Sequence, residues 1–289
     1  MIDVATVTAI DFHVHTELTR EGHDPLPPEL RAAAASYFGS DEPLPTVDDV
    51  AEYYRARNMA AVLFTVDWEA RSGRPQIPSE EVADAARANP DVLIPFASVD
   101  PSRSDAVERA RRLIDEHGVK GFKFHPNLQE FFPDDRVAYA LYEVIAEAGL
   151  PALFHTGHSG IGTGLPGGGG LHLKYSNPLH LDDVAADFPT LQIVLAHPSF
   201  PWQDEAISIC LHKANVWIDL SGWSPKYFPP QLVQYANTQL REKVLFGSDF
   251  PLLTPDRWLA DFADAPFKDD VRPLILKENA ARLLGLRPA

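Results

Sequence analysis

The chain has 289 residues, a length that one large α/β domain reaches without dividing into two. Its formal net charge is −16 and no segment gathers Lys and Arg, so we do not expect nucleic acid as a partner. Cys210 is the single cysteine, which excludes an internal disulfide and a zinc site built from several thiolates. The N-terminal segment lacks a basic flank with a long apolar stretch, and no run of about 18 apolar residues occurs, so we expect a cytoplasmic protein without membrane contact.

Short runs rich in apolar and β-branched residues recur along the chain, and segments with helical periodicity separate them. Repeated strand–helix units predict a parallel sheet, and eight strands suffice to close a barrel. We therefore expect an α/β fold, a single (β/α)8 TIM barrel that takes up residues 1–289 as one domain. The expected strands are residues 9–15, 60–66, 92–99, 119–125, 151–156, 191–197, 215–220 and 243–249.

Helices are expected between these strands, because several segments begin at Ser, Asp or Thr and end at Gly or Asn. They cover residues 47–58, 79–89, 103–118 and 135–149, and a terminal helix is expected over 269–286. Extended βα loops are expected after strands 1, 2 and 5, at residues 16–45, 67–78 and 157–177. Loops at the carboxyl ends of barrel strands form the active-site face, so these segments should shape a pocket.

Candidate metal-binding and proton-transferring side chains occur at the carboxyl ends of four expected strands. They are His13 and His15 on the first strand, His155 on the fifth, His197 on the sixth and Asp249 on the eighth. Alternate residues of a strand share one face, so the two imidazoles of the first strand point to the same side. Imidazole suits zinc and similar divalent metals, and a carboxylate would complete a site that leaves a position for water. The pattern predicts a catalytic metal site.

The segments AIDFHVHT, LFHTG, VLAHPS and LFGSDFP, in this order, resemble the amidohydrolase superfamily. NVWIDLSGW and the terminal KENAARLLGL resemble its branch that includes aminocarboxymuconate semialdehyde decarboxylase and related metal-dependent hydrolases. The resemblance implies one divalent metal held by His13, His15, His155 and Asp249, with zinc as the first expectation, manganese as the second, and a second metal less expected. It also implies a proton-transferring or second-site role for His197, and a catalytic role for Asp249 beside its role as a ligand.

The fourth expected strand, in GFKFHP, adds Lys123 and His125 near the same ends. Lys123 has three possible roles: a carboxylated lysine that bridges two metals, as in the dihydroorotases that this segment resembles; a point charge for a substrate carboxylate; or a structural lysine. We favour substrate binding and a single metal. Further candidates for substrate contact are His158 and His172, which flank the Gly-rich loop, and Trp223 after the seventh strand.

This arrangement predicts a hydrolase in which metal-activated water attacks an amide, ester or lactone of a small carboxylated or aromatic molecule. The first alternative is a metal-dependent non-oxidative decarboxylase of an aromatic or unsaturated carboxylic acid, in which a proton replaces carbon dioxide. The second alternative is an inactive barrel that serves as a binding module. A homodimer is expected only because it is the commonest assembly among soluble oligomeric proteins.

Overall fold

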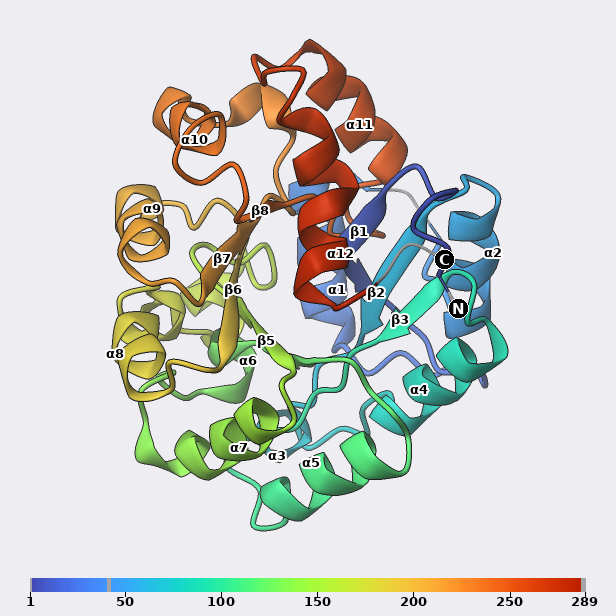
Figure 1. Ribbon diagram of the computed structural model, residues 1–289. Helices are drawn as coiled ribbons and strands as arrows, with labels where there is room; N and C mark the ends of the chain where they lie inside the picture. The colour runs from blue at the N-terminus through green and yellow to red at the C-terminus, as the bar shows by residue number, and fades with distance from the viewer. Residues whose placement is uncertain (1, 41–42, 287–289) are drawn as a thin grey trace.

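The computed structural model describes residues 2–40 and 43–286. Its strands form two parallel sheets in chain order. The first sheet contains β1 (Ile10–His15), β2 (Ala60–Phe64) and β3 (Leu93–Pro95). The second contains β4 (Phe122–Phe124), β5 (Pro151–His155), β6 (Gln192–Ala196), β7 (Val216–Asp219) and β8 (Val244–Leu245). Each strand coincides with one of the runs that the sequence indicated, and Figure 1 shows them at the centre of the molecule with helices around them.

Backbone contacts connect the edges of the two sheets. Ala97, just after β3, forms an isolated parallel bridge with Phe122 of β4. At the other junction Val14 of β1 forms a parallel bridge with Phe250, and the amide of Phe12 donates to the carbonyl of Phe246 at 2.9 Å. The carboxyl ends of β1 and β8 therefore lie next to each other, although 230 residues separate them in the chain.

The helices alternate with the strands. They are α1 (Pro28–Phe38), α2 (Val47–Arg55), α3 (Glu69–Ser72), α4 (Ser79–Ala88), α5 (Ala106–Asp115), α6 (Pro126–Gln129), α7 (Arg136–Glu147), α8 (His180–Asp187), α9 (Gln203–His212), α10 (Pro230–Ala236), α11 (Pro255–Asp264) and α12 (Asn279–Leu283). The four helices expected between strands correspond to α2, α4, α5 and α7. Thr46 shows why α2 begins there, because it exchanges side-chain and backbone hydrogen bonds with Asp49 in a capping box.

Three expected loops, the expected terminal helix and several strand ends differ from the structure in detail. The segments expected as loops after β1 and β2 contain α1 and α3, and the segment after β5 contains two 3-10 turns, Pro166–Gly170 and Leu173–Ser176. The expected terminal helix over 269–286 is a π-helical turn, Leu274–Glu278, followed by the short α12. Several expected strands are also too long at their carboxyl ends. At the ends of 191–197 and 243–249 the backbone turns into the left-handed region described below.

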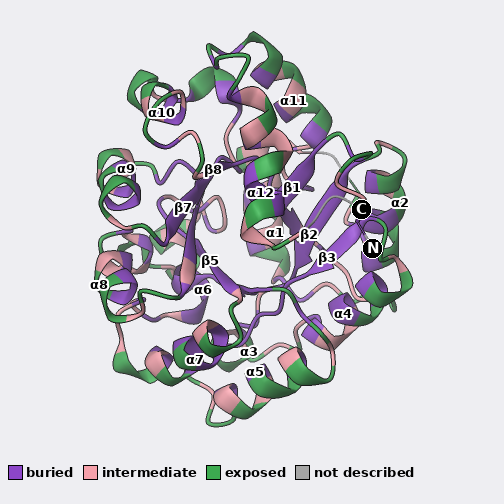
Figure 2. Cartoon of the chain, viewed as in Figure 1, coloured by how far each residue is buried: buried purple, intermediate pink, exposed green. Residues whose placement is uncertain are grey.

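Successive side chains of a strand point to opposite faces of the sheet. One face is turned toward the centre of the molecule and the other packs against the helices. Leu153 of β5 belongs to a buried apolar cluster with Phe12 and Phe96, whereas its neighbour Phe154 packs on the other face against Tyr142 of α7. Figure 2 shows buried strands inside helices whose outer faces are exposed. His155 follows Leu153 by two residues, so its side chain lies on the inner face at the carboxyl end of the strand.

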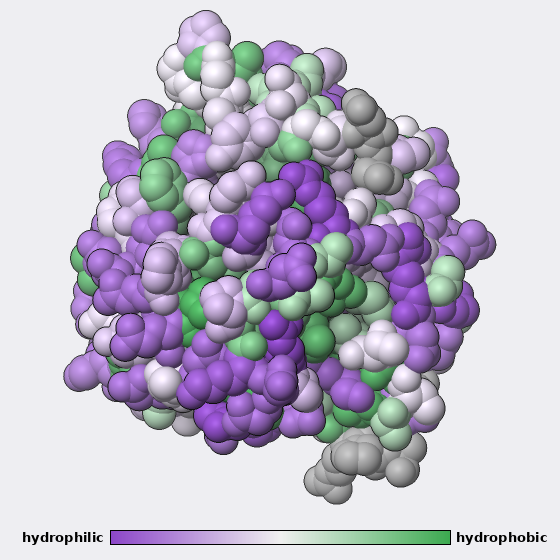
Figure 3. All heavy atoms as spheres, turned by 90° about the horizontal axis from the view of Figure 1, so that it is seen from above, coloured by the Kyte–Doolittle hydropathy of each residue, from purple (hydrophilic) through white to green (hydrophobic). Residues whose placement is uncertain are grey.

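The surface agrees with the acidic composition. Figure 3 shows a face on which hydrophilic residues predominate and apolar residues gather in small groups. Within residues 2–40 and 43–286, no helix has the length and apolar character that crossing a bilayer requires.

Candidate metal centre

Two imidazole nitrogens and one carboxylate oxygen meet where β1 and β8 end. Nε2 of His13 and Nε2 of His15 each lie 3.3 Å from Oδ1 of Asp249, and the two nitrogens lie 3.3 Å from each other. Ligands bound at about 2.0–2.1 Å to a tetrahedral zinc ion are roughly 3.3–3.4 Å apart, so this triangle already has the dimensions of one face of such a site. His13 and Asp249 are buried and His15 is partly exposed, which leaves the triangle open on one side. The residues present therefore fit a divalent metal.

Lys123 lies inside this group of ligands, deeper than the sequence analysis placed it. Its side chain is fully buried, and Nζ lies 3.2 Å from Nε2 of His13 and 4.9 Å from the centre of the Phe64 ring. Burial lowers its pKa to about 8, although the nearby carboxylates of Asp219 and Asp249 act in the opposite direction. A lysine in this position can present a single positive charge, or a reactive neutral amine, next to the metal ligands.

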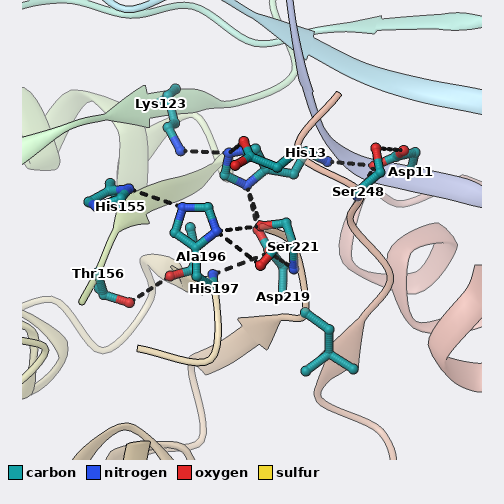
Figure 4. A network of polar contacts seen from close by, with 12 residues as sticks. Asp11, His13, Lys123, His155, Thr156, Ala196, His197, Asp219, Ser221 and Ser248 are labelled. Carbon is teal, nitrogen blue, oxygen red and sulfur yellow. Dashed lines mark hydrogen bonds and ion pairs between the residues drawn. The ribbon is translucent and has the colours of Figure 1, made fainter. Parts of the chain in front are cut away.

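A second pair of imidazoles lies beside the first group (Figure 4). Nδ1 of His155 is 3.0 Å from Nε2 of His197, and Nδ1 of His197 is 3.1 Å from the carbonyl oxygen of Ser221. Nε2 of His155 is buried and has no hydrogen-bond partner within the part of the chain that the structure describes. Of the four ligands that the resemblance implies, the structure brings His13, His15 and Asp249 together, while His155 faces His197. A ligand role for His155 stays a prediction.

The turns after β6 and β8 have an unusual backbone. His197 and Asp249 have φ values of 72° and 74°, in the left-handed region that non-glycine residues seldom adopt. Gly222 at φ 71° fits between them, since a Cβ atom there would lie 2.8 Å from Nδ1 of His197 and 3.2 Å from Oδ2 of Asp249. Strained backbone of this kind persists where the surrounding structure requires it, and often at functional sites. Here it ends the strands and turns both side chains toward β1.

Burial favours neutral imidazoles at this site, and the contacts of Asp249 with the neighbouring histidines favour its ionised carboxylate. Desolvation lowers the pKa of His13, His125 and His155 well below the ordinary histidine value. Desolvation alone would raise the pKa of Asp249, but the imidazoles of His13, His15 and His197 lower it far below its usual range. Neutral imidazole nitrogens and an ionised carboxylate are the forms that bind a metal ion.

The metal-free protein is expected to lose stability as the pH falls below 6.5, the ordinary pKa of histidine. Below that value the unfolded chain binds more protons than the folded chain, because burial has lowered the pKa of several histidines, so the free energy of unfolding decreases with acidification. Thermal unfolding between about pH 7.5 and pH 5 measures this decrease. The fall should be shallower in His125→Asn, which removes one buried imidazole and none of the three clustered ligand atoms. Equal slopes for the two proteins would contradict the assignment.

A cavity opens onto these residues and has an apolar wall. Its polar floor consists of His13, His15, Lys123, His125, His155, His197 and Asp249. Its apolar wall includes Leu26, Phe38, Trp68, Ile77, Leu128 and Ile161, and Leu26, Trp68 and Leu128 belong to a small separate apolar cluster. The wall residues come from the segments after β1, β2, β4 and β5, so the loops that the sequence analysis expected to shape a pocket do contribute to it.

The predicted substrate-contacting residues divide into three groups. Lys123 and His125 line this cavity, and the His125 ring stacks on His155 at 4.0 Å between centroids. His158 and Trp223 line a smaller adjoining cavity, which also touches His155, His197 and Asp249. His172 is exposed and belongs to neither lining; its ring contacts Tyr175. Its position therefore gives no support to a role in substrate contact.

The sequence analysis missed the polar residues that hold the ligands. Asp219, at the end of β7, lies 2.9 Å from Nδ1 of His13, and Ser221 lies within 3.0 Å of both His13 and His197. On the other side of the site, the buried Asp11 accepts hydrogen bonds from Tyr54 and from the backbone and side chain of Ser248. Burial raises the pKa of Asp11 to about 7. The signal for Asp219 was available, because DLSG follows the apolar run of the seventh strand.

Solved structures similar to this chain share its fold. An uncharacterized TIM-barrel protein from Bordetella bronchiseptica is 25% identical with a TM-score of 0.76, covering 96% of this chain and 98% of that one. A dihydroxybenzoic acid decarboxylase from Polaromonas sp. JS666 with bound manganese and an inhibitor is 17% identical with a TM-score of 0.64, covering 98% of each chain. A probable 2-pyrone-4,6-dicarboxylic acid hydrolase from Acinetobacter baumannii is 15% identical with a TM-score of 0.63, covering 96% of this chain and 100% of that one.

Among curated proteins, Protein fluG of Emericella nidulans is 32% identical over 113 residues. That match covers 36% of this chain and only 12% of the length of fluG. Residues 10–286 match the family described as Amidohydrolase, which covers nearly the whole chain and contains every residue of the site. The chain belongs to the amidohydrolase family.

Proposed function

We propose that this protein is a metal-dependent hydrolase that cleaves an amide, ester or lactone bond of a small carboxylated or aromatic molecule. The observation that carries the proposal is the triangle of ligand atoms from His13, His15 and Asp249, with sides of 3.3 Å, on the floor of a cavity. We infer that the strands close into a single (β/α)8 barrel; the backbone bridges at both junctions of the two sheets support this. The site would then lie at the carboxyl end of the barrel, where such enzymes have their active sites.

A divalent metal bound here would polarise a substrate oxygen and make water a better nucleophile near neutral pH. Side chains of the protein would orient the substrate and transfer protons. The carboxylate of Asp249 lies beside His13 and His15, where it is placed to accept the proton that the attacking water releases. His197, a buried imidazole on the same floor, is placed to orient the reacting group and to pass that proton on to the leaving atom. Zinc is our first choice of metal because of the donor set, and manganese is the second.

The walls and floor of the cavity favour a substrate with an apolar body and a negative charge. Trp68, Phe38 and Ile161 provide apolar contact surface. Lys123 presents its charge next to the metal ligands, where a substrate carboxylate would be neutralised. These two features support a small carboxylated molecule with a planar or apolar part.

The second candidate function is non-oxidative decarboxylation of an aromatic or unsaturated carboxylic acid. The charge of Lys123 beside the metal site favours it, because that charge could hold the carboxylate that leaves as carbon dioxide. A proton taken from water and passed on by His197 or Asp249 would then take its place on carbon. Similar folds include proteins named as decarboxylases and as a hydrolase, so the fold does not choose between the two reactions.

One panel of substrates tests both candidates. Lactones, amides and aromatic carboxylates are incubated in parallel with the zinc-loaded and manganese-loaded protein, and each reaction is scored for acid release and for carbon dioxide. We expect acid release from a carboxylated lactone or amide without carbon dioxide. Carbon dioxide alone would establish the decarboxylase. Protein that retains neither metal and turns over nothing in the panel would support the third reading, an inactive barrel that acts as a binding module.

A further inference from the structure

Asp219 and Ser221 form a buried hydrogen-bonding centre between β1, β6 and β7. Oδ1 of Asp219 accepts from the backbone amides of Ser221 at 2.8 Å and of His197 at 3.3 Å. Oδ2 lies 2.9 Å from Nδ1 of His13. Both residues are fully buried, and Figure 4 shows them between the rings of His13 and His197. With these contacts both oxygens of Asp219 are engaged.

These acceptors determine where His13 carries its proton. An ionised carboxylate only accepts hydrogen bonds, so Nδ1 of His13 must be the protonated nitrogen of the neutral ring. Nε2 then carries the lone pair, and Nζ of Lys123 lies 3.2 Å from it. That lone pair lies at the triangle shared with His15 and Asp249, which is where a metal would need it.

The same reasoning extends to His197 and His155. The carbonyl oxygen of Ser221 can only accept, so Nδ1 of His197, 3.1 Å away, carries the proton. Nε2 of His197 is therefore an acceptor, and Nδ1 of His155, 3.0 Å away, must donate to it. This leaves Nε2 of His155 without a proton, which agrees with its lack of a hydrogen-bond partner among the described residues. One chain of contacts thus assigns the tautomers of three histidines.

We propose that Asp219 and Ser221 are positioning residues that fix His13, His197 and His155 as Nδ1–H tautomers, so that Nε2 is the unprotonated nitrogen of each ring. This inference rests on the proposed metal site and deepens it, because the pair would act without binding the metal. The hydroxyl of Ser221 reinforces the assignment: Oγ lies 3.0 Å from Nδ1 of His13 and 2.9 Å from Nδ1 of His197, where it can accept from either.

Asp219→Asn gives a specific test, because an amide has one accepting and one donating end. Its oxygen must stay at the Oδ1 position to accept the two backbone amides, which turns the NH2 group toward Nδ1 of His13. Nδ1 must then accept, and the proton moves to Nε2, where it blocks the metal. Asp219→Ala imposes no such reversal, since the Ser221 hydroxyl remains to accept from Nδ1. The isosteric variant should therefore be more harmful than the truncated one.

The first measurement is zinc affinity, by competition with a chromogenic chelator. We expect Kd to rise roughly 100-fold in Asp219→Asn and roughly 10-fold in Asp219→Ala, within the range usual for residues that support metal ligands. Asp100→Asn, which makes the same change at a buried aspartate that bonds to Ser102, is the matched control and should keep the wild-type affinity. An affinity of Asp219→Asn equal to that of wild type, or no weaker than that of Asp219→Ala, would overturn the proposal.

The second measurement reads the tautomers directly in the metal-free proteins, from two-bond proton–nitrogen correlations after labelling histidine with nitrogen-15. The His13 signals are assigned by their loss in His13→Gln. Wild type should show Nδ1–H at His13 and Asp219→Asn should show Nε2–H, whereas an unchanged tautomer would overturn the proposal even if the affinity fell. A wild-type protein that binds neither zinc nor manganese would overturn the proposed function, and the tautomers would still decide the role of Asp219.

Discussion

Asp249→Asn and His13→Ala are each expected to remove the bound metal and to lower kcat/KM by roughly three orders of magnitude or more, the effect of losing several kcal/mol of metal-dependent stabilisation. Each variant removes one corner of the triangle of ligand atoms, and Asp249→Asn also removes the carboxylate that would accept a proton. Metal content after dialysis and kcat/KM on a substrate identified with the panel are the two measurements.

Asp249→Asn is the more informative of these two variants, because it should change the site without disturbing the fold. Asparagine has nearly the same shape as aspartate and is tolerated in the left-handed region that position 249 occupies, so the fold should survive. His13→Ala leaves Oδ2 of Asp219 without the His13 ring in the core and should lower the melting temperature. His212→Ala, an exposed histidine near the end of α9, is the control and should match wild type in metal content and turnover. Wild-type activity in Asp249→Asn would rule out the proposed mechanism.

The order of the strands could be predicted because their side chains alternate or run apolar over five or six residues between helical segments. The lengths of the strands could not be predicted. The expected eighth strand, 243–249, is hydrogen-bonded as a strand only at Val244–Leu245. Beyond it Ser248 bonds to Asp11 of β1, and Asp249 takes a positive φ, so local side-chain contacts replace the regular ladder. When contacts with a neighbouring strand shape the end of a strand, the strand's own sequence does not show where it ends.

The gathering of site residues could be predicted from one geometric fact, that the carboxyl ends of parallel strands meet on one face. It brings His13, His15 and Asp249 together in the structure. Ring orientation could not be predicted, because it depends on hydrogen bonds between residues far apart in the chain. His155 turns Nδ1 toward His197, 42 residues away, which the position of a histidine at a strand end does not reveal.

Burial and loop conformation set further limits on prediction. Lys123 was expected near the ends of the strands, and in the structure it lies under the ligands because its strand neighbour Leu153 faces the interior. His172 was expected near the substrate because it follows the Gly-rich loop, yet the segment turns it outward. In the sequence Asp219 lies at the end of an expected strand, as the candidate histidines do. A single carboxylate there is as often structural as functional, and only its contact with His13 gives it a role.

Lys123→Met is expected to lower kcat/KM for a carboxylated substrate roughly 10- to 100-fold, the usual effect of losing one hydrogen bond to a charged group. Methionine keeps the length of the side chain and removes the charge beside His13. Burial lowers the pKa of Lys123 to about 8, so the wild-type enzyme should lose kcat/KM as the pH rises through that value and the ammonium gives up its proton. The variant should lack this decline. Lys120→Met, an exposed lysine on the same segment, is the control.

Chemical rescue of Lys123→Ala distinguishes a free ammonium at this position from a carboxylated lysine. If the free ammonium acts on the substrate, a small alkylamine should restore part of the lost activity, because it returns a cation to the buried space. If Lys123 is carboxylated, a small carboxylic acid should restore activity instead, and the wild-type protein should bind two equivalents of metal and carry the added mass of one carbon dioxide. We expect rescue by the amine and one equivalent of metal, because Nζ already lies within 3.2 Å of His13 and needs no added group to reach the site. Rescue by the acid would assign Lys123 to a bridge between the His13 group and the His155–His197 pair.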